Sequence, residues 1–420
     1  VLANDSDVED DPLIVGDFTQ PGNGTIADNA DGTFTYMPTA GFNGTNTFTY
    51  RAWDGQDYSE PATVTIAVRP SEEYHWANPT GGSWHTPANW DRNAVPGADD
   101  RAVIDLDGTY TVTLSQNAAI SEIVAGGGTG TQTVTKTGGT LQLTYRADLS
   151  ESVVFEMRGG TLGGTGVLTV AGHFDWTGGN LSGAGQTWVD GSLRVGGTAE
   201  KWLRYGYTLG NRGAASWADD AEVRTRDGGR IVNEGTWDFA SAGWIRYFYN
   251  DVARFENLGL VTRTGSNDTA RVDMVFDNLG QLRVDSGQLS WTRGGTSSGS
   301  WEVAAGAAVR LSGDTHVLDS QSVVDVDGLL IQDGGTSRIG GSGTGSGGVQ
   351  ALGGNLHLDG SHTLTGASRI TAGLYANGTP TLGDLTMTSG TLGGTGVLTV
   401  AGHFDWTGGN LSGAGQTWVD

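Results

Sequence analysis

Hydrophobic residues in the first 69 positions fall into short segments in which apolar and polar side chains alternate. Four such segments, rich in β-branched and aromatic residues, occupy residues 13–18, 32–37, 45–53 and 62–68. Pro-Gly, Asn-Gly and Asp-Gly pairs separate them, and such pairs favour tight turns. Short strands at this spacing predict a β-sandwich over residues 1–69.

The hydrophobic pattern from about residue 131 onward repeats at a spacing near 20 residues. The segment 162–172 aligns with 181–191 at a spacing of 19, and Asn233, Asn257 and Asn278 recur at spacings of 24 and 21. Strands of three to five residues at this period predict a parallel β-helix, because a propeller would need a period of ~40–50 residues. We expect Asn257 and Asn278 to stack at one turn, with left-handed backbone and hydrogen bonds along the stack.

A much longer repeat lies over this short one. Residues 160–190 and 390–420 are identical, at an offset of 230 residues. At a rise of ~4.8 Å per coil, the unit would span roughly 11 coils and ~50 Å of rod. We expect the solenoid to continue beyond Asp420, and repetition on this scale favours a structural or adhesive role over a single active site.

Residues 70–130 differ from both neighbouring regions, since Trp76, Trp84 and Trp90 lie close together there. The first coil of a solenoid needs its open edge and hydrophobic end covered, and bulky tryptophans can do this. The predicted organisation is therefore a β-sandwich over 1–69, a Trp-rich cap over 70–130 and a solenoid over 131–420.

Several motifs resemble known bacterial surface proteins. Residues 1–69 carry VLANDSD at 1–7, DGTFTY at 31–36, GFNGT at 41–45, FTYR at 48–51 and Asp54-Gly55. Together they resemble the cadherin-like and immunoglobulin-like repeats of large adhesins, which normally begin with a further strand, so we expect this domain to be incomplete at its N-terminus. The Trp-rich stretch resembles the opening of bacterial β-solenoid surface proteins, and the Asn series resembles haemagglutinin-type and autotransporter-type solenoids. These resemblances imply a right-handed parallel β-helix at the bacterial cell surface or outside the cell.

Composition excludes several functional classes. The formal net charge is −24 and Lys occurs only at Lys136 and Lys201, so no basic stripe is present to bind nucleic acid. The absence of Cys excludes thiolate zinc sites and Cys catalysis. No apolar run approaches ~18 residues, so we expect no membrane span in this segment.

The densest acidic run lies near the N-terminus, where hard oxygen ligands at alternate positions suit Ca²⁺. In the resembling families, acidic residues there bind calcium and stiffen the joint between modules, at ~10⁻⁴ to 10⁻³ M for extracellular modules. The alternative is a solvated acidic turn. The expected calcium ligands are Asn4, Asp5, Asp7, Glu9, Asp10 and Asp54. A second acidic cluster, which we expect to flank a strand, comprises Asp99, Asp100, Asp105 and Asp107.

Aromatic and arginine residues concentrate in the least repetitive part of the chain, 197–250. Three interpretations remain open: core packing, a protein interface, or a glycan-binding face formed by stacking and hydrogen bonding. The candidate interface residues are Trp202, Tyr205, Trp217, Trp244, Tyr247 and Tyr249.

Catalytic signals are weak, since no HExxH, GxSxG or P-loop motif is present. Asp219, Asp220 and Glu222 beside Arg224 are the candidates for a polysaccharide lyase or hydrolase, and a solvated loop is the favoured interpretation. We therefore expect no enzyme, but a structural or adhesive segment of a bacterial extracellular protein that forms a calcium-stiffened rod or filament. Its expected partners are copies of itself, adjacent repeats and surface glycans; the alternative is a glycan-active enzyme or a carbohydrate-binding module.

Overall fold

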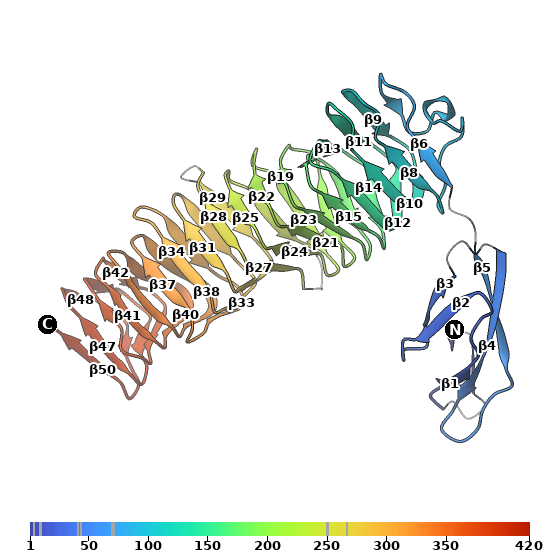
Figure 1. The fold of residues 1–420 in the computed structure, drawn as a ribbon. Helices are drawn as coiled ribbons and strands as arrows, with labels where there is room; N and C mark the ends of the chain where they lie inside the picture. The colour runs from blue at the N-terminus through green and yellow to red at the C-terminus, as the bar shows by residue number, and fades with distance from the viewer. Residues whose placement is uncertain are drawn as a thin grey trace. The chain divides into compact units, whose positions relative to one another are not determined.

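The computed structural model describes residues 1–2, 5–7, 11–39, 42, 44–68, 72–248, 252–265 and 268–420. The chain forms two compact units, Val1–Glu72 and Glu73–Asp420 (Figure 1). Both are built from strands, which confirms the all-β prediction. Within the described ranges, the helical elements include a 3₁₀ turn at Pro87–Asn89, and no helix is long and apolar enough to cross a membrane.

The N-terminal unit is a small β-sandwich. Strands β1 (Ile14–Phe18), β4 (Gly44–Trp53) and β5 (Ala62–Val68) form an antiparallel sheet, and β2 (Gly24–Asp28) pairs with β3 (Phe34–Pro38) in a second one. The two sheets share one core, because the Phe34 ring lies 5.0 Å from Phe18 and 5.0 Å from Phe48, edge to face. Strand β2 was not predicted, because its one buried apolar side chain, Ile26, gives little periodic signal.

The second unit is a right-handed parallel β-solenoid of about 15 turns, as predicted. Each coil contributes strands to three faces, and each strand pairs in parallel with its neighbours one coil before and after (Figure 1). The first face contains β14 (Thr161–Gly164), β17 (Gly179–Ser182), β20 (Lys201–Arg204), β23 (Glu222–Arg226), β26 (Trp244–Tyr247), β29 (Thr269–Val272), β32 (Gln288–Trp291), β35 (Ala308–Leu311), β42 (Ser368–Ile370), β45 (Leu385–Met387) and β48 (Phe404–Trp406).

The second face contains β6 (Glu73–His75), β8 (Arg101–Ile104), β15 (Val167–Val170), β18 (Gln186–Val189), β21 (Thr208–Asn211), β24 (Arg230–Asn233), β27 (Arg254–Asn257), β30 (Val275–Asn278), β33 (Gly295–Ser297), β36 (Thr315–Leu318), β43 (Gly373–Ala376), β46 (Thr391–Gly393) and β49 (Asn410–Leu411). Four longer strands continue across the corner from the first face to the second: β10 (Ala118–Ala125), β12 (Thr140–Leu149), β38 (Leu329–Ile339) and β40 (Gly348–Leu358).

The third face contains β7 (Gly82–Ser83), β9 (Tyr110–Leu114), β11 (Gln132–Lys136), β13 (Val153–Met157), β16 (His173–Trp176), β19 (Ser192–Val195), β22 (Ala214–Trp217), β25 (Thr236–Phe239), β28 (Leu260–Arg263), β31 (Gln281–Val284), β34 (Ser300–Val303), β37 (Val323–Val326), β39 (Ser342–Gly345), β41 (Ser361–Leu364), β44 (Thr381–Leu382), β47 (Val397–Val400) and β50 (Gln416–Val419).

The core fills the inside of the coils, because alternate residues of each strand point inward. The predicted 19-residue spacing is one coil, since Leu162 pairs with Leu181 and Val170 with Val189 in adjacent coils. Further along, large rings fill the interior, and the Phe276 and Trp291 rings stack at 3.8 Å.

A buried ladder of asparagines ends four successive strands of the second face. The amide of each donates to the side-chain oxygen of the next, over 2.8, 2.8 and 2.7 Å, from Asn211 through Asn233 and Asn257 to Asn278. The ladder continues to Ser297 at 3.2 Å. The predicted stacking of Asn257 and Asn278 is therefore confirmed, but the predicted left-handed backbone is wrong: both residues end extended strands, and neither has a positive φ.

A tryptophan cluster closes the first coil. Trp76, Trp84 and Trp90 are buried, and the Trp90 ring lies 5.2 Å and 4.8 Å from the other two. These residues belong to the same core as the coils. Parallel pairing already begins at β6, so the predicted cap over 70–130 also contains the first coils, and position 131 marks no change of architecture.

The two identical segments lie on different faces of the solenoid. In the first copy, Thr161–Gly164 is on the first face, Val167–Val170 on the second and His173–Trp176 on the third. In the second copy, the same sequences begin on the second face with β46, continue on the third with β47 and reach the first with β48. Because β45 lies eleven coils after β14 on one face and β46 is the next strand, the 230-residue repeat spans eleven coils and one strand.

Candidate functional site

An acidic hollow of about 490 Å³ lies at one edge of the N-terminal sandwich. The Asp5 carboxylate accepts a 2.6 Å hydrogen bond from the Tyr50 hydroxyl, and burial together with this bond raises the pKa of Tyr50 to about 12. Asp54 accepts hydrogen bonds from the backbone of Gln56 and Asp57 at 2.6 and 2.7 Å, which lowers its pKa. The acidic residues that line the hollow are Asp5, Asp7, Asp54, Asp57 and Glu60.

The hollow brings together three of the six predicted calcium ligands, Asp5, Asp7 and Asp54. The other three, Asn4, Glu9 and Asp10, lie outside the described residues. Among the residues that the structure describes, no three acidic or histidine side chains converge closely enough to hold a metal ion. The described residues therefore supply a carboxylate-lined hollow without a closed coordination shell.

The second predicted acidic cluster stabilises turns of the first coils. Asp100 accepts a hydrogen bond from the backbone of Gly97 at 2.7 Å, and Asp105 lies 3.6 Å from the His75 ring. Asp107 accepts hydrogen bonds from the backbone and hydroxyl of Thr129 at 2.6 and 3.0 Å, which lowers its pKa. These contacts, and a further one of Asp99, fit the interpretation of strand-flanking residues.

Aromatic and arginine side chains form a continuous stripe on the outside of the first face. The Arg224 guanidinium lies 5.6 Å from the Trp202 ring centre and 5.4 Å from that of Phe248. Arg246 lies 4.3 Å from Trp244, and Arg271 lies 4.8 Å from the same ring. We call this set the aromatic–arginine stripe: Trp202, Arg224, Trp244, Arg246, Phe248 and Arg271.

A hollow of about 480 Å³ opens beside Trp244 in this stripe, lined by residues of three successive coils. The Trp244 indole N–H donates to Asp273 at 2.9 Å, and Arg271 pairs with the same carboxylate at 2.9 Å. The residues lining this Trp244 hollow are Asp220, Glu222, Ala242, Gly243, Trp244, Thr269 and Arg271.

The remaining predicted interface residues separate into different environments. Tyr205 is 48% exposed and lies at a corner beside Arg226, and Tyr247 lies 4.0 Å from the Arg293 guanidinium. The prediction of Trp217 as an interface residue is wrong, because its side chain is 1% exposed and packs inside the coils. Tyr249 lies outside the described residues.

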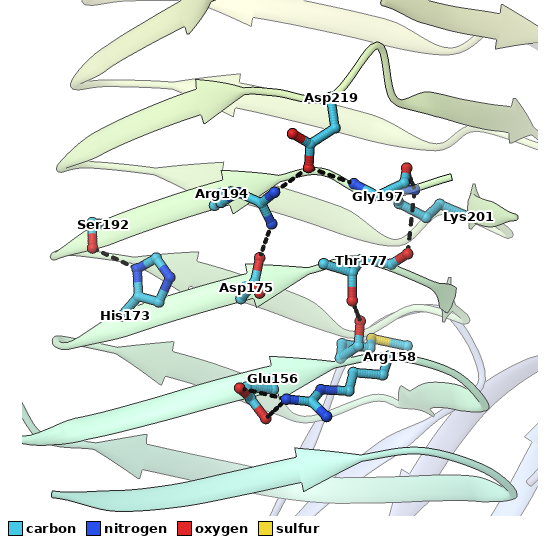
Figure 2. A network of polar contacts seen from close by, with 11 residues as sticks. Glu156, Arg158, His173, Asp175, Thr177, Ser192, Arg194, Gly197, Lys201 and Asp219 are labelled. Atoms are coloured by element: carbon cyan, nitrogen blue, oxygen red, sulfur yellow. Dashed lines mark hydrogen bonds and ion pairs between the residues drawn. The ribbon is translucent and has the colours of Figure 1, made fainter. Parts of the chain in front are cut away.

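Two of the three carboxylates considered for catalysis, Asp219 and Glu222, take part in ion pairs. Arg194 bridges Asp175, at 2.9 Å, and Asp219 on two other coils (Figure 2). Asp219 also accepts from the backbone of Gly197, and Glu222 pairs with Arg224 at 2.9 Å. His173, in the same view, shares a 2.7 Å hydrogen bond with Ser192.

Both lysines are buried at the corner between the third and first faces, which sequence reasoning did not foresee. The Lys201 ammonium donates to the carbonyl of Thr177 at 3.4 Å (Figure 2). It also donates to the carbonyls of Gly197 and Ala199 at 2.9 and 2.8 Å. Lys136 donates to the carbonyls of Gly138 and Gly139. Burial lowers the pKa of each lysine to about 8. Lys136 ends β11 just before a turn and Lys201 begins β20 just after one, and in the sequence only the rarity of lysine distinguished them in advance.

Comparison with known proteins gives one family match. No curated protein and no solved structure matches the chain. Residues 1–69 match the cadherin-like domain family, which agrees with the sandwich of the first unit and with the sequence motifs that resembled it.

Proposed function

We propose that this chain is a structural and adhesive segment of a bacterial extracellular protein, in which the solenoid serves as a stiff rod. The observation that carries this proposal is an uninterrupted stack of parallel coils whose sequence repeats after 230 residues. Each coil contacts mainly its neighbours, so such a stack grows in length by addition of coils. The cadherin-like unit supports an extracellular setting.

Small-angle X-ray scattering of the full chain tests the rod. About 15 coils at ~4.8 Å predict that the solenoid contributes a rigid segment ~70 Å long with a constant cross-section, to which the first unit adds. A concentration series in the same experiment tests the proposed self-association, because filament formation would lengthen the particle. A compact, near-spherical particle would contradict the proposal.

We further propose that the acidic hollow of the first unit binds Ca²⁺ and stiffens that unit. The cadherin-like match and the position of Asp5, Asp7 and Asp54 along the lining of one hollow support this proposal. We expect thermal melting of the first unit to shift upward on addition of millimolar Ca²⁺ and to return on chelation. Asp54→Asn should abolish the shift, whereas Asp107→Asn, in the solenoid, should leave it unchanged; a shift retained in the first variant would refute the site.

We also propose that the chain is not an enzyme. The pairing of Asp219 with Arg194 and of Glu222 with Arg224 supports this, since both carboxylates are engaged in contacts between or within coils. Prolonged incubation with neutral and anionic polysaccharides should release no new reducing ends. Cleavage that disappears in Asp219→Ala or Asp220→Ala would establish the alternative, a glycan-active enzyme.

A further inference from the structure

We propose that the Trp244 hollow on the first face binds a neutral, hydroxyl-rich polysaccharide chain. This inference rests on the proposed adhesive role and names the class of ligand that the surface recognises. It is carried by the position of the aromatic side chains, the fixed hydrogen-bonding groups around them, and the local balance of charge.

The aromatic rings of the stripe are not needed for the core. Trp202 and Trp244 occupy outward positions, while Leu203 and Ile245 of the same strands point inward and are fully buried. In the rows of paired residues that contain these tryptophans, neighbouring coils carry polar side chains: Asn180 and Arg224 beside Trp202, and Glu222 and Arg271 beside Trp244. Large rings outside a core expose apolar area to water, and such patches commonly mark interaction sites.

The polar groups of the hollow are held in place before any ligand arrives. Asp273 is only 13% exposed and accepts from both the Trp244 indole and Arg271, so it fixes two lining side chains. Glu222 accepts from Arg224 at 2.9 Å. Fixed side chains lose little conformational freedom on binding, which favours affinity.

This arrangement suits a sugar polymer. Carboxylates accept and guanidinium groups donate hydrogen bonds, so together they can pair with hydroxyl groups. The solvent-accessible part of the aromatic rings supplies apolar surface for the C–H groups of the sugar. Lining residues come from three successive coils, around β23, β26 and β29, so a chain running along the axis meets a new set of groups on each coil.

Charge favours a neutral chain over a polyanion. The lining of the hollow presents Asp220 and Glu222 against Arg271, and the flanking Arg224 and Arg246 already lie against the Glu222 carboxylate. The protein as a whole carries a formal net charge of −24. A polysaccharide that carries carboxylate or sulfate groups would be repelled on approach by this surplus of negative charge.

Affinity electrophoresis of the full chain tests the proposal, with gels that contain soluble galactomannan, mixed-linkage β-glucan or dextran, and parallel gels with alginate or hyaluronan. We expect at least one neutral polysaccharide to retard the wild-type protein. Trp244→Ala should weaken that binding at least about tenfold, as for a central aromatic contact. Glu222→Gln, which keeps the shape of the side chain, should weaken it too.

Trp188→Ala is the matched control, because Trp188 is also a half-buried outward tryptophan, 4.1 Å from the Arg212 guanidinium, but lies on the second face. It should bind like wild type. Retardation by none of the neutral polysaccharides, retardation only by the polyanions, or wild-type binding by Trp244→Ala with retained near-ultraviolet circular dichroism would each overturn the proposal. Such a failure would not contradict the proposed rod, because small-angle scattering tests the rod independently of polysaccharide binding.

Discussion

The buried asparagine ladder is the clearest case of a single residue type stabilising the stack of coils. Asn257 donates to Asn278 and to the backbone of Gln281, and accepts from Asn233. Asn257→Ala would leave buried groups on both neighbouring coils without partners, at ~1–3 kcal/mol each. We expect a loss of about 3 kcal/mol in the free energy of unfolding, measured by urea denaturation.

Asn180→Ala provides the comparison for this substitution. Asn180 also donates to the preceding coil, to the Thr161 hydroxyl at 3.1 Å, but it is partly exposed, so water can replace the bond. The expected loss is below ~1 kcal/mol. Equal losses in the two variants would show that the buried ladder adds nothing beyond an ordinary surface hydrogen bond.

The buried lysines give the solenoid a specific dependence on pH. The pKa of Lys201 is lowered from 10.5 to about 8 in the folded chain, because burial disfavours the charged form. Between these two values, the unfolded chain still holds a proton that the folded chain has released. Stability therefore rises with pH through this window. Below it both states are protonated, so Lys201 no longer makes the stability depend on pH.

Lys201→Met isolates this effect, since it keeps the length of the side chain and removes the titrating group. Urea denaturation at several pH values between 8 and 10.5 should give a steeper rise of stability for the wild type than for the variant. Parallel curves would mean that the folded and unfolded chains bind the Lys201 proton equally.

At the scale of elements, the Trp cluster should control the stability of the first coils. Trp84 is fully buried, so Trp84→Ala would cost ~3–5 kcal/mol in lost burial and cavity formation. In a stack where each coil contacts its neighbours, this loss should act locally. Hydrogen exchange should accelerate in β8–β12 and stay unchanged in β31–β41; uniform acceleration would instead show one cooperative unit.

The period of the coils could be predicted from sequence because identical side chains recur where strands stack. Which side chains point inward was harder to predict. In β22, Ala214–Trp217, three small residues precede the buried Trp217, and in β26, Trp244–Tyr247, all four residues are large, so neither sequence shows which side chains face inward. Because Ile245 points inward, its neighbour Trp244 points outward. Which of the two residues points inward depends on where the preceding corner ends. The aromatic–arginine stripe and the lysine corners share this dependence on tertiary context.

At the scale of the whole molecule, the two identical segments show that this sequence specifies a path around the coil but not a particular face. The inward side chains of one equivalent strand are buried in both positions: Leu168 and Val170 on the second face, Leu398 and Val400 on the third. Since the inward and outward alternation is the same on all three faces, the segment fits each of them. Equivalent outward residues such as Thr169 and Thr399 therefore lie on different faces. A surface feature at a given position of the 230-residue repeat thus moves to the next face of the solenoid in the following repeat.

Engineered disulfides test this rotation directly, because the chain has no cysteine. Thr386 and Asp405 are paired outward residues on adjacent strands of the first face, and strand neighbours ~4.8 Å apart fit the Cα spacing that a disulfide needs. Thr386→Cys with Asp405→Cys should therefore cross-link under mild oxidation, detected by peptide mass spectrometry. If the second copy kept the phase of the first while β44 stayed on the third face, Thr386 would lie in a corner between faces, and Asp405 would lie on the third face beside Thr381 of β44. Cross-linking of Thr381→Cys with Asp405→Cys, without cross-linking of the first pair, would thus refute the rotation. The rotated register also pairs Thr381 with Thr399, so Thr381→Cys with Thr399→Cys should form a disulfide.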